Sequence, residues 1–285
     1  MSHAELIDSS SPVALITGAN TGIGRYTVLG LVERGYKVYM ACRSEEKTQA
    51  VIVEILKTHP NAWVQWLPLD LANFSSVQDC AKSFLLNQSQ LDLLINNAGV
   101  GGEKGLTIEG FEMAFGVNHM GHFLLTHCLM DALLRARAPR VVTVASNAHR
   151  FAWGIDWSKV RQETKSILGA KDYAVSKLAN ILFSSQLSKN HRHQGLAAYS
   201  LHPGVIQSDF WRHLPSTLMP LVKWGPLISP KQGALTSLYC SLDAPHSETG
   251  FFYANSRIKK PTVFARDESL AAELWERSRE WIQKG

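Results

Sequence analysis

The segment Thr17-Gly18-Ala19-Asn20-Thr21-Gly22-Ile23-Gly24 lies between an apolar run, Val13–Thr17, and a stretch with helical spacing, Gly22–Glu33. Its three glycines permit a tight turn, a close approach of phosphate to the backbone, and close packing of a helix against a strand. A helix that begins there points free N–H groups at an anion. A glycine-rich turn can also be purely structural, but its place between a first strand and a helix favours a dinucleotide site.

The rest of the chain repeats this alternation of strand and helix. We expect further strands at Lys37–Met40, Val64–Leu69, Leu93–Ile95, Val141–Ala145, Ala197–Leu201 and Phe251–Tyr253. Helical spacing is found at Glu45–Lys57, Phe74–Leu85, Phe111–Arg135, Tyr173–Leu187, Pro230–Cys240 and Glu268–Gln283. Such alternation implies parallel strands joined by right-handed crossovers. The prediction is one Rossmann-type, doubly wound α/β domain over residues 1–285, with about seven parallel strands, helices on both faces and a flexible tail at 1–11.

The composition excludes several classes of protein. With 285 residues, of which 45% are hydrophobic and 19% charged, the chain can bury a core, so disorder is not its main state. The net charge of +5 comes from scattered residues rather than a basic stripe, which argues against a nucleic-acid partner. We expect neither disulfides nor a metal site, because the cysteines lie far apart and the histidines lack metal-ligand spacing (Cys42, Cys80, Cys128, Cys240; His119, His122, His149, His202).

The amino-terminal segment, MSHAELIDSSS, has neither the positive region nor the apolar region of a signal peptide. No apolar run in the sequence approaches the roughly 18–20 residues that span a bilayer. We therefore expect a cytoplasmic protein without a transmembrane segment.

The end of the second expected strand indicates which nucleotide binds. A site for NAD usually carries a carboxylate about 20 residues after the glycines, to bind the ribose 2′-hydroxyl. Here the stretch is Met40-Ala41-Cys42-Arg43-Ser44, and the next carboxylate is Glu45. The Arg43 guanidinium can instead pair with a 2′-phosphate, with Arg25 nearby, although a solvated arginine at a helix start is the plainer alternative. The sequence therefore favours NADP over NAD.

Two further strand ends carry nucleotide candidates. Asp70 ends the third strand, where it can contact adenine or instead cap the next helix. Asn96-Asn97-Ala98-Gly99 follows the fourth strand, where small residues let the backbone pass close to a ribose. A plain turn would also explain this quartet.

Tyr173 and Lys177 are the strongest candidates for chemistry. Four residues apart on a helix, they share one face, although such pairs often arise by chance. An ammonium beside the phenol, together with the positive nicotinamide of an oxidised cofactor, would lower the pKa of Tyr173 from its usual value near 10. The phenol could then exchange protons near neutrality. Ser146, after the fifth strand, can donate a hydrogen bond to a substrate oxygen, and the Asn118 amide can hold a water that relays protons to Lys177.

These motifs occur together and in order: TGANTGIG, NNAG, a serine after the fifth strand, YAVSK, and the turn His202-Pro203-Gly204. In this combination the chain resembles the short-chain dehydrogenase/reductase superfamily from about Pro12 to Trp281. More narrowly, it resembles the retinol dehydrogenase-like branch, which includes the WW-domain oxidoreductase and related carbonyl reductases. The segments that carry this likeness are ACRS, NHMGHFLLT, SNAHRF, YAVSKLANILF, LHPGVIQSDF and LAAELWERS.

The resemblance implies a role for each matching residue. Tyr173 would be the general acid/base, Lys177 the residue that lowers its pKa, Ser146 the partner of the substrate oxygen, and Asn118 the proton relay. The nucleotide would be bound by Gly18, Asn20, Thr21, Gly22, Ile23, Gly24, Arg43, Asp70, Leu71, Asn97, Ala98, Gly99, Tyr173, Lys177, Pro203, Gly204, Ile206 and Ser208. Hydride would pass between the nicotinamide and a carbonyl or alcohol carbon as Tyr173 gives or takes the proton.

The same resemblance places a substrate lid at residues 208–228. Its side chains are mostly apolar, and we expect Phe210 and Trp211 to contact substrate together with Ser146. This favours a lipophilic or aromatic substrate of retinoid, steroid or aldehyde type, although packing, a subunit interface or peripheral membrane contact would also explain the segment. The expected function is an NADP(H)-dependent oxidoreductase acting on a small carbonyl or alcohol, with helical surfaces that can support a homodimer. The alternative is an NADP(H)-binding regulatory or scaffold protein with little or no turnover.

Overall fold

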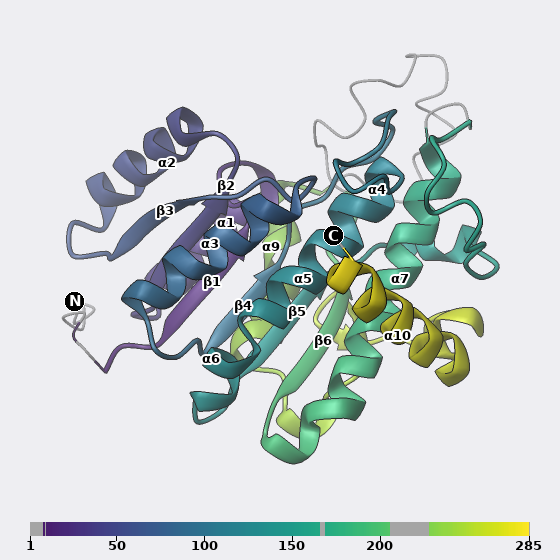
Figure 1. Ribbon diagram of the computed structural model, residues 1–285. Helices are drawn as coiled ribbons and strands as arrows, with labels where there is room; N and C mark the ends of the chain where they lie inside the picture. Colours follow the sequence, from purple (N-terminus) through teal and green to yellow (C-terminus); the bar gives the residue numbers. More distant parts are fainter. Residues whose placement is uncertain (1–7, 9, 166–168, 206–227, 285) are drawn as a thin grey trace.

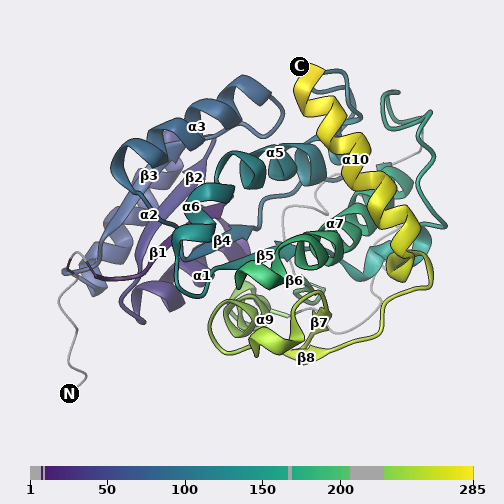
Figure 2. The ribbon, with the colours of Figure 1, turned by 60° about the horizontal axis from the view of Figure 1, so that its bottom comes forward.

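The computed structural model describes residue 8 and residues 10–165, 169–205 and 228–284. Within these ranges, eight strands form one sheet in the order β3-β2-β1-β4-β5-β6-β7-β8. Figure 1 labels β1 to β6, and Figure 2 also labels β7 and β8. All neighbouring strands run parallel except β7 and β8. The strands are β1 (Val13–Thr17), β2 (Lys37–Cys42), β3 (Val64–Pro68), β4 (Leu93–Asn96), β5 (Arg140–Val144), β6 (Ala197–His202), β7 (Phe252–Ala254) and β8 (Arg257–Ile258). The fold is the doubly wound α/β type that the sequence predicts.

The central strands are buried on both faces, which is why they appear in the sequence as continuous apolar runs. Every residue of β1, β4 and β6 is buried. β1 pairs with β2 on one side and with β4 on the other, so that Thr17 lies beside Ala41 and Ile16 beside Ile95. The strand order reverses between β1 and β4, and a sheet of this type binds its ligand in the crevice beyond the carboxyl ends of those strands.

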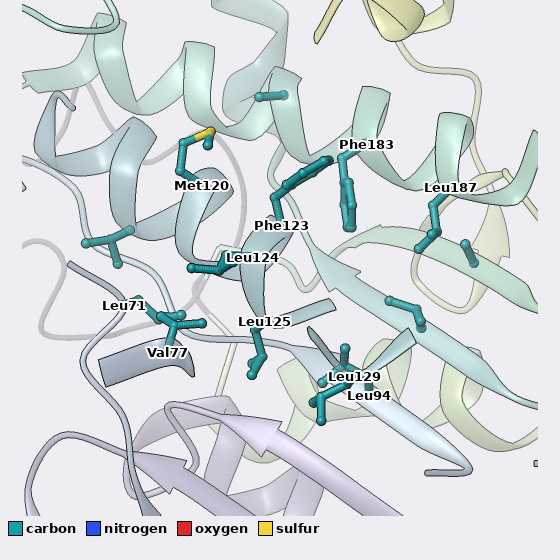
Figure 3. Close-up of a cluster of buried hydrophobic side chains, with 14 of the residues drawn as sticks. Leu71, Val77, Leu94, Met120, Phe123, Leu124, Leu125, Leu129, Phe183 and Leu187 are labelled. Carbon is teal, nitrogen blue, oxygen red and sulfur yellow. The ribbon is translucent and has the colours of Figure 1, made fainter. Parts of the chain in front are cut away.

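Helices cover both faces of the sheet (Figure 2). The helices on one face are α1 (Gly22–Val32), α2 (Glu45–Thr58) and α9 (Pro230–Leu242). The helices on the other are α3 (Phe74–Asn87), α5 (Gly121–Cys128), α6 (Met130–Arg135) and α7 (Ala170–His191). A separate hydrophobic cluster joins each set to the sheet. Figure 3 shows part of the cluster on the face covered by α3, α5, α6 and α7, in which the Phe123 ring of α5 contacts the Phe183 ring of α7.

The carboxyl-terminal helix α10 (Glu268–Lys284) lies across α7 (Figure 2). Trp275 of α10 stacks on Phe183 with 6.0 Å between ring centroids, and it meets Phe123 edge-on at 5.1 Å. Trp281 packs edge-on against Phe111 at 5.4 Å. These aromatic contacts make the tail of the chain part of the core on this face of the sheet.

The expected helix at Phe111–Arg135 is divided in the structure. It consists of α4 (Met113–Phe115), a π-helical turn at Gly116–Met120, α5 and α6. Close contacts coincide with both ends of the π-helical turn. A Cβ on Gly116 would lie 2.2 Å from the Thr107 side chain, and a Cβ on Gly121 would lie 2.5 Å from the Leu71 carbonyl oxygen. The predicted helical stretch is thus present as consecutive helical segments, and the two glycines let it pack closely on the neighbouring loops.

The sheet has one strand more than the expected seven. Asn255 and Ser256 take positive φ angles of 53° and 56°. Such angles close the two-residue turns of β-hairpins, and the short strand β8 folds back on β7 in this way. The eighth strand is consequently antiparallel and lies at the edge of the sheet.

Candidate active site

The glycine-rich turn after β1 packs directly against the loop after β4. Gly18 has a φ of +62°, and a Cβ there would lie 2.9 Å from both the Cα and the Cβ of Ala98. A Cβ on Gly24 would lie 2.5 Å from the Gly18 carbonyl oxygen and 2.7 Å from Nδ2 of Asn97. Both positions therefore require glycine, and the two loops that carry nucleotide candidates are in direct contact.

Thr17, the last residue of β1, holds these two loops together. Its hydroxyl oxygen accepts hydrogen bonds from the backbone N–H groups of Asn97 at 3.0 Å and Ala98 at 2.9 Å. The Asn97 side-chain amide donates in return to the carbonyls of Thr17 at 2.7 Å and Gly18 at 3.2 Å. This double set of bonds holds the loop after β1 against the loop after β4.

The first turn of α1 is open to a ligand. Its N-cap, Thr21, makes no side-chain capping bond, and both Thr21 and Gly22 are exposed. A Cβ on Gly22, where φ is +53°, would meet nothing within 4 Å. The Asn20 amide donates to the Thr48 hydroxyl of α2 at 3.1 Å, and so secures the turn from the other side. Free N–H groups of a helix start, beside a cradle that admits only glycine, fit the pyrophosphate of a dinucleotide.

Arg43 is exposed just past the end of β2, and no hydrogen bond or ion pair joins its guanidinium to any residue that the structure describes. Arg25, the other candidate for a 2′-phosphate, is instead paired with Glu54 of α2 and lies over the Tyr26 ring, 5.8 Å from its centroid. Of this pair of arginines, Arg43 is therefore the one that is available to a nucleotide.

Asp70 and Leu71 lie in the loop after β3. One carboxylate oxygen of Asp70 accepts from the Ala72 N–H at 3.0 Å, whereas the N-cap of α3 is Asn73. Asp70 therefore does not cap the helix, which removes the structural alternative that its sequence position left open. Leu71 is buried, and its carbonyl packs against Gly121 of α5.

Tyr173, Lys177 and Ser146 meet where α7 crosses the end of β5. Tyr173 is hydrogen-bonded to the Ser146 side chain, and Nζ of Lys177 lies 5.5 Å from the centroid of the Tyr173 ring. Lys177 is only 3% exposed and donates to the carbonyl of Val144 at 3.0 Å. Asn180 donates to the same carbonyl at 3.1 Å. These bonds pin α7 to the last residue of β5, and they bring together the three side chains that the sequence predicts to act together.

Burial sets the ionisation of this group. It raises the pKa of Tyr173 to about 12, and the hydrogen bond with Ser146 opposes that rise only in part. It lowers the pKa of Lys177 to about 7. The sequence predicts that the Lys177 ammonium lowers the pKa of the phenol, but the protein alone does not lower it. A buried lysine carries only part of its charge at neutral pH, so it opposes the effect of burial weakly. The further positive charge of an oxidised nicotinamide would act in the required direction.

The Asn118 side chain lies in the π-helical turn and is fully bonded to protein. Its Oδ1 accepts from the Val100 N–H at 2.8 Å. Its Nδ2 donates to the Val100 carbonyl at 2.9 Å and to the Ser176 hydroxyl at 2.9 Å. The amide therefore anchors the loop after β4, and its role in holding a relay water stays a prediction. π-Helical turns are frequent at functional sites, and this one sets the position of Asn118.

Gly99 is the point at which Asn118 and Lys177 come together. A Cβ on Gly99 would lie 3.2 Å from Oδ1 of Asn118 and 3.2 Å from Nζ of Lys177. The backbone carbonyl of Asn118 faces Nδ1 of His122 at 3.0 Å, and Nε2 of His122 faces the Thr17 hydroxyl at 2.8 Å. A buried chain of hydrogen bonds thus runs from the nucleotide loops to the residue beside Lys177.

The turn after β6 completes the described part of the site. Gly204 has a φ of +101°, and a Cβ there would lie 2.4 Å from Cδ1 of Ile228. The Ile228 N–H donates to the Val205 carbonyl at 3.0 Å, so the residues that flank 206–227 are adjacent. Pro203 lies in this turn. The candidates outside the described residues are Ile206, Ser208, Phe210 and Trp211, together with residues 208–227 of the expected lid.

A cavity of about 510 Å³ lies beside the first turns of α7. Phe151 and Trp153, in the segment between β5 and α7, line it from one side and are 64% and 84% exposed. Asp172 and Val175, which flank Tyr173 on α7, line it from the other. Among the residues described, no cluster of side chains could hold a metal ion, and no helix is both long and apolar enough to cross a membrane.

Comparison with known proteins decides the family. A sequence model described as short chain dehydrogenase matches residues 12–218. Human retinol dehydrogenase 11 is 41% identical over 271 residues, which cover 93% of this chain and 83% of that protein. The chain belongs to the short-chain dehydrogenase/reductase family. Within it the chain falls in the retinol dehydrogenase-like branch, and it is accordingly an oxidoreductase of small molecules.

Other relatives agree with this assignment. Human dehydrogenase/reductase SDR family member 13 is 39% identical over 278 residues, with 93% of this chain and 72% of that protein covered. The crystal structure of an uncharacterized protein from Mycobacterium paratuberculosis superposes with a TM-score of 0.75 at 32% identity, over 98% of this chain and 96% of that one. A short chain dehydrogenase from Shigella flexneri complexed with NADP has a TM-score of 0.69 at 22% identity, over 89% of this chain and 100% of that one, and supports the fold alone.

Sequence reasoning missed the residues that hold the short-chain dehydrogenase/reductase site together. Thr17 lies in the quoted motif TGANTGIG, and Ser176 and Asn180 lie in YAVSKLANILF, but the sequence alone assigns none of the three a role. The only role that the sequence analysis considers for His122 itself is that of a metal ligand. The one available signal is the NHMGH segment, in which His122 follows Asn118 by four residues and so lies on the same helical face.

Proposed function

We propose that the chain is an NADP(H)-dependent oxidoreductase that transfers hydride between the nicotinamide and a carbonyl or alcohol group of a lipophilic or aromatic small molecule. The observation that carries this proposal is the contact of Tyr173 with Ser146 over a buried Lys177, next to loops that fit a dinucleotide. The bound cofactor would supply the hydride. The protein supplies the orientation and the proton.

Each side chain has a defined part in the reduction of a carbonyl. The Tyr173 hydroxyl is protonated at neutral pH, because burial raises its pKa to about 12, and it is ready to donate its proton to the carbonyl oxygen. Ser146, which bonds Tyr173, can donate a second hydrogen bond to the same oxygen. As negative charge develops on the phenol, the nearby Lys177 amine gains a proton more readily and stabilises that charge. Alcohol oxidation reverses these steps.

The choice of NADP rests on Arg43. Its guanidinium is exposed at the end of β2, the position at which a nucleotide's ribose is bound in this fold. A carboxylate, the usual ligand of the NAD ribose, follows only at Glu45, in the first turn of α2. A cation without a protein partner among the described residues is suited to pair with a 2′-phosphate.

Two observations support a lipophilic substrate. The relatives include human retinol dehydrogenases 11, 12 and 13, whose names state an apolar alcohol as substrate. In this chain, Phe151 and Trp153 present large exposed aromatic surfaces on the segment that follows Ser146. We therefore propose a substrate of retinoid, steroid or apolar aldehyde type.

The proposal is tested by fluorescence titration of the purified protein with NADPH and NADH, followed by a panel of carbonyls that includes all-trans-retinal and small aldehydes. Tighter binding of NADPH than of NADH, with NADPH oxidised by an apolar carbonyl, is the expected result. Tight binding without turnover of any carbonyl, or of the corresponding alcohols with NADP⁺, would instead favour a regulatory protein. Failure to bind either nucleotide would contradict the proposal altogether.

A further inference from the structure

The peptide group that follows Ser146 is held at both of its polar atoms by a histidine. The Ser146 carbonyl oxygen lies 2.7 Å from Nδ1 of His149. The Asn147 N–H, at the other end of the same peptide group, donates to Nδ1 of His202 at 3.3 Å. The two imidazoles come from different elements, since His149 lies in the 3₁₀ turn Asn147–Phe151 and His202 is the last residue of β6.

The sheet explains why a side chain is needed here. The ladder between β5 and β6 ends with the bond from the Ala145 N–H to the Leu201 carbonyl, at 2.8 Å. Beyond this point the chain turns away from β6, and the next bond is made to the His202 imidazole instead of to a carbonyl. His202 therefore extends the sheet by one hydrogen bond, up to the residue after Ser146.

The partners determine which nitrogen of each imidazole carries the proton. A carbonyl oxygen can only accept, so His149 must be protonated at Nδ1; its Nε2 then accepts from the Thr262 N–H at 3.4 Å. A backbone N–H can only donate, so Nδ1 of His202 must be free of a proton. The two histidines are consequently neutral and of opposite tautomers.

Burial and charge both favour these neutral forms. His149 is fully buried, with the Phe252 ring edge-on at 5.2 Å, and His202 is 8% exposed. Burial lowers the pKa of both imidazoles, and that of His202 falls to about 4. The charged groups that face them are cationic, Arg150 for His149 and Lys259 for His202, and they lower both pKa values further.

We propose that His149 and His202 are positioning residues, which grip the peptide group after Ser146 and thereby fix the Ser146 hydroxyl against Tyr173. This inference rests on the proposed function. The peptide group sets the ψ angle of Ser146, which is 155°, and so sets the direction in which its side chain leaves the backbone. Neither imidazole is required to touch the substrate or the cofactor.

The test compares leucine and asparagine at both positions. His149→Leu and His202→Leu remove the imidazole bonds, while the backbone bond from the N–H of residue 149 to the Ser146 carbonyl, at 3.2 Å, is kept. His149→Asn and His202→Asn return an amide donor or a carbonyl acceptor close to the place of Nδ1. We expect each leucine variant to lose about tenfold in kcat, the equivalent of roughly 1.4 kcal/mol, with the Kd for NADPH and the KM for substrate nearly unchanged. The asparagine variants should recover most of the loss. Val141→Ala, at the opposite end of β5, controls for a general loss of stability.

Wild-type kcat in both leucine variants would overturn the proposal, and so would asparagine variants as slow as the leucine ones. A second measurement does not depend on turnover: two-bond ¹⁵N–¹H correlation spectra of the histidines, assigned with the asparagine variants. We expect His149 protonated at Nδ1 alone and His202 at Nε2 alone near neutral pH. The same tautomer in both histidines, or a charged imidazole in either, would refute the proposal that His149 and His202 hold this peptide group. Absence of turnover in the wild type would count against the proposed function, while the spectra would still show whether the two imidazoles hold the peptide group after Ser146.

Discussion

Tyr173 and Lys177 share one buried environment, and it moves their pKa values in opposite directions. The phenol is held as a protonated acid with a pKa of about 12, and the amine is left only partly charged with a pKa of about 7. The energy of any charge on the phenol thus depends on its immediate neighbours, namely Lys177 below the ring and the cofactor. Under the proposed function, this dependence would let Tyr173 act as an acid in one direction and as a base in the other.

Replacing Tyr173 with phenylalanine removes the proton donor and leaves the ring in place. We expect kcat to fall by at least about a hundredfold, the usual contribution of a positioned acid or base. The Kd for NADPH should remain near that of the wild type. Tyr239→Phe, a partly buried tyrosine on α9, is the matched control and should leave kcat unchanged. Substantial turnover by Tyr173→Phe would show that another group supplies the proton.

Arg43 is expected to decide between the two nicotinamide nucleotides. Arg43→Asp replaces a cation by an anion at the end of β2 and would repel a 2′-phosphate. A charge-assisted hydrogen bond is worth about 1.5–3 kcal/mol, so the Kd for NADPH should rise by about ten- to a hundredfold while that for NADH changes little. The measurement is a fluorescence titration of the variant and of Arg34→Asp, an exposed arginine elsewhere. An unchanged ratio of the two Kd values would remove Arg43 from the site.

For single residues, the sequence points to the side chains that are proposed to react but not to the residues that hold them in place. Tyr173, Lys177 and Ser146 are recognisable because their side chains carry reactive groups at informative spacings. Thr17 and His202 are not, because a hydroxyl or an imidazole gains its role from a backbone group that is distant in the sequence. Such partners become visible only when the chain has folded.

Among the elements, α10 contributes two tryptophans, Trp275 and Trp281, to the face that carries α7. Trp275 lies between Phe123 and Phe183, and His119 reaches the Ser278 hydroxyl of the same helix at 2.9 Å. Because α7 carries both Tyr173 and Lys177, the packing of α10 bears directly on the position of these two side chains.

Trp275→Ala should therefore destabilise the whole domain. Truncation of a packed tryptophan costs about 3 kcal/mol, which should be measurable as a lower free energy of unfolding in urea. Trp153→Ala is the matched control, since Trp153 is 84% exposed, and it should change stability by less than about 0.5 kcal/mol. Equal losses in the two variants would mean that α10 does not stabilise the domain as its contacts indicate.

The bounds of a helix could be predicted where one of its faces is buried and the other is exposed. They were harder to predict where the whole helix is buried. Helices α2, α3 and α10 have clear polar faces, and their positions agree with the sequence to within a few residues. Residues 114–126 are all buried, so no alternation of polar and apolar residues marks the π-helical turn. The strand β8 was missed because its two residues are exposed and too few to form a pattern.

Across the whole molecule, the interior contains several neutral histidines. Burial lowers the pKa of His119 to about 3 and the pKa values of His122 and His202 to about 4, against 6.5 for an exposed imidazole. Below pH 6.5 the unfolded chain therefore binds protons that the folded chain excludes. The stability due to each neutral histidine is fully present above that pH, and it is lost as the pH falls toward the folded-state value.

The free energy of unfolding should accordingly fall on acidification, by up to about 1.4 kcal/mol per pH unit for each such histidine. Urea unfolding at about pH 7 and about pH 5 measures this slope. His119→Gln keeps a polar group near Ser278 but cannot be protonated, so its slope should be shallower than that of the wild type. Identical slopes would show that His119 is not a buried neutral imidazole.

The fold as a whole was the most predictable level. Alternating strands and helices define the doubly wound sheet, and the switch point between β1 and β4 then places the site without further information. The hydrogen bonds between its loops, and the ionisation of its buried groups, depend on distances that no linear pattern contains.

The most direct test of the account is to follow one hydride. The protein is mixed with NADPH that carries deuterium at both C4 positions of the nicotinamide and with a carbonyl that it accepts, and the alcohol is examined by mass spectrometry. We predict one deuterium on the carbinol carbon of the product with the wild type, and no labelled product with Tyr173→Phe. Tight binding of NADPH without transfer of deuterium to any carbonyl would contradict the central claim that this site carries out reduction.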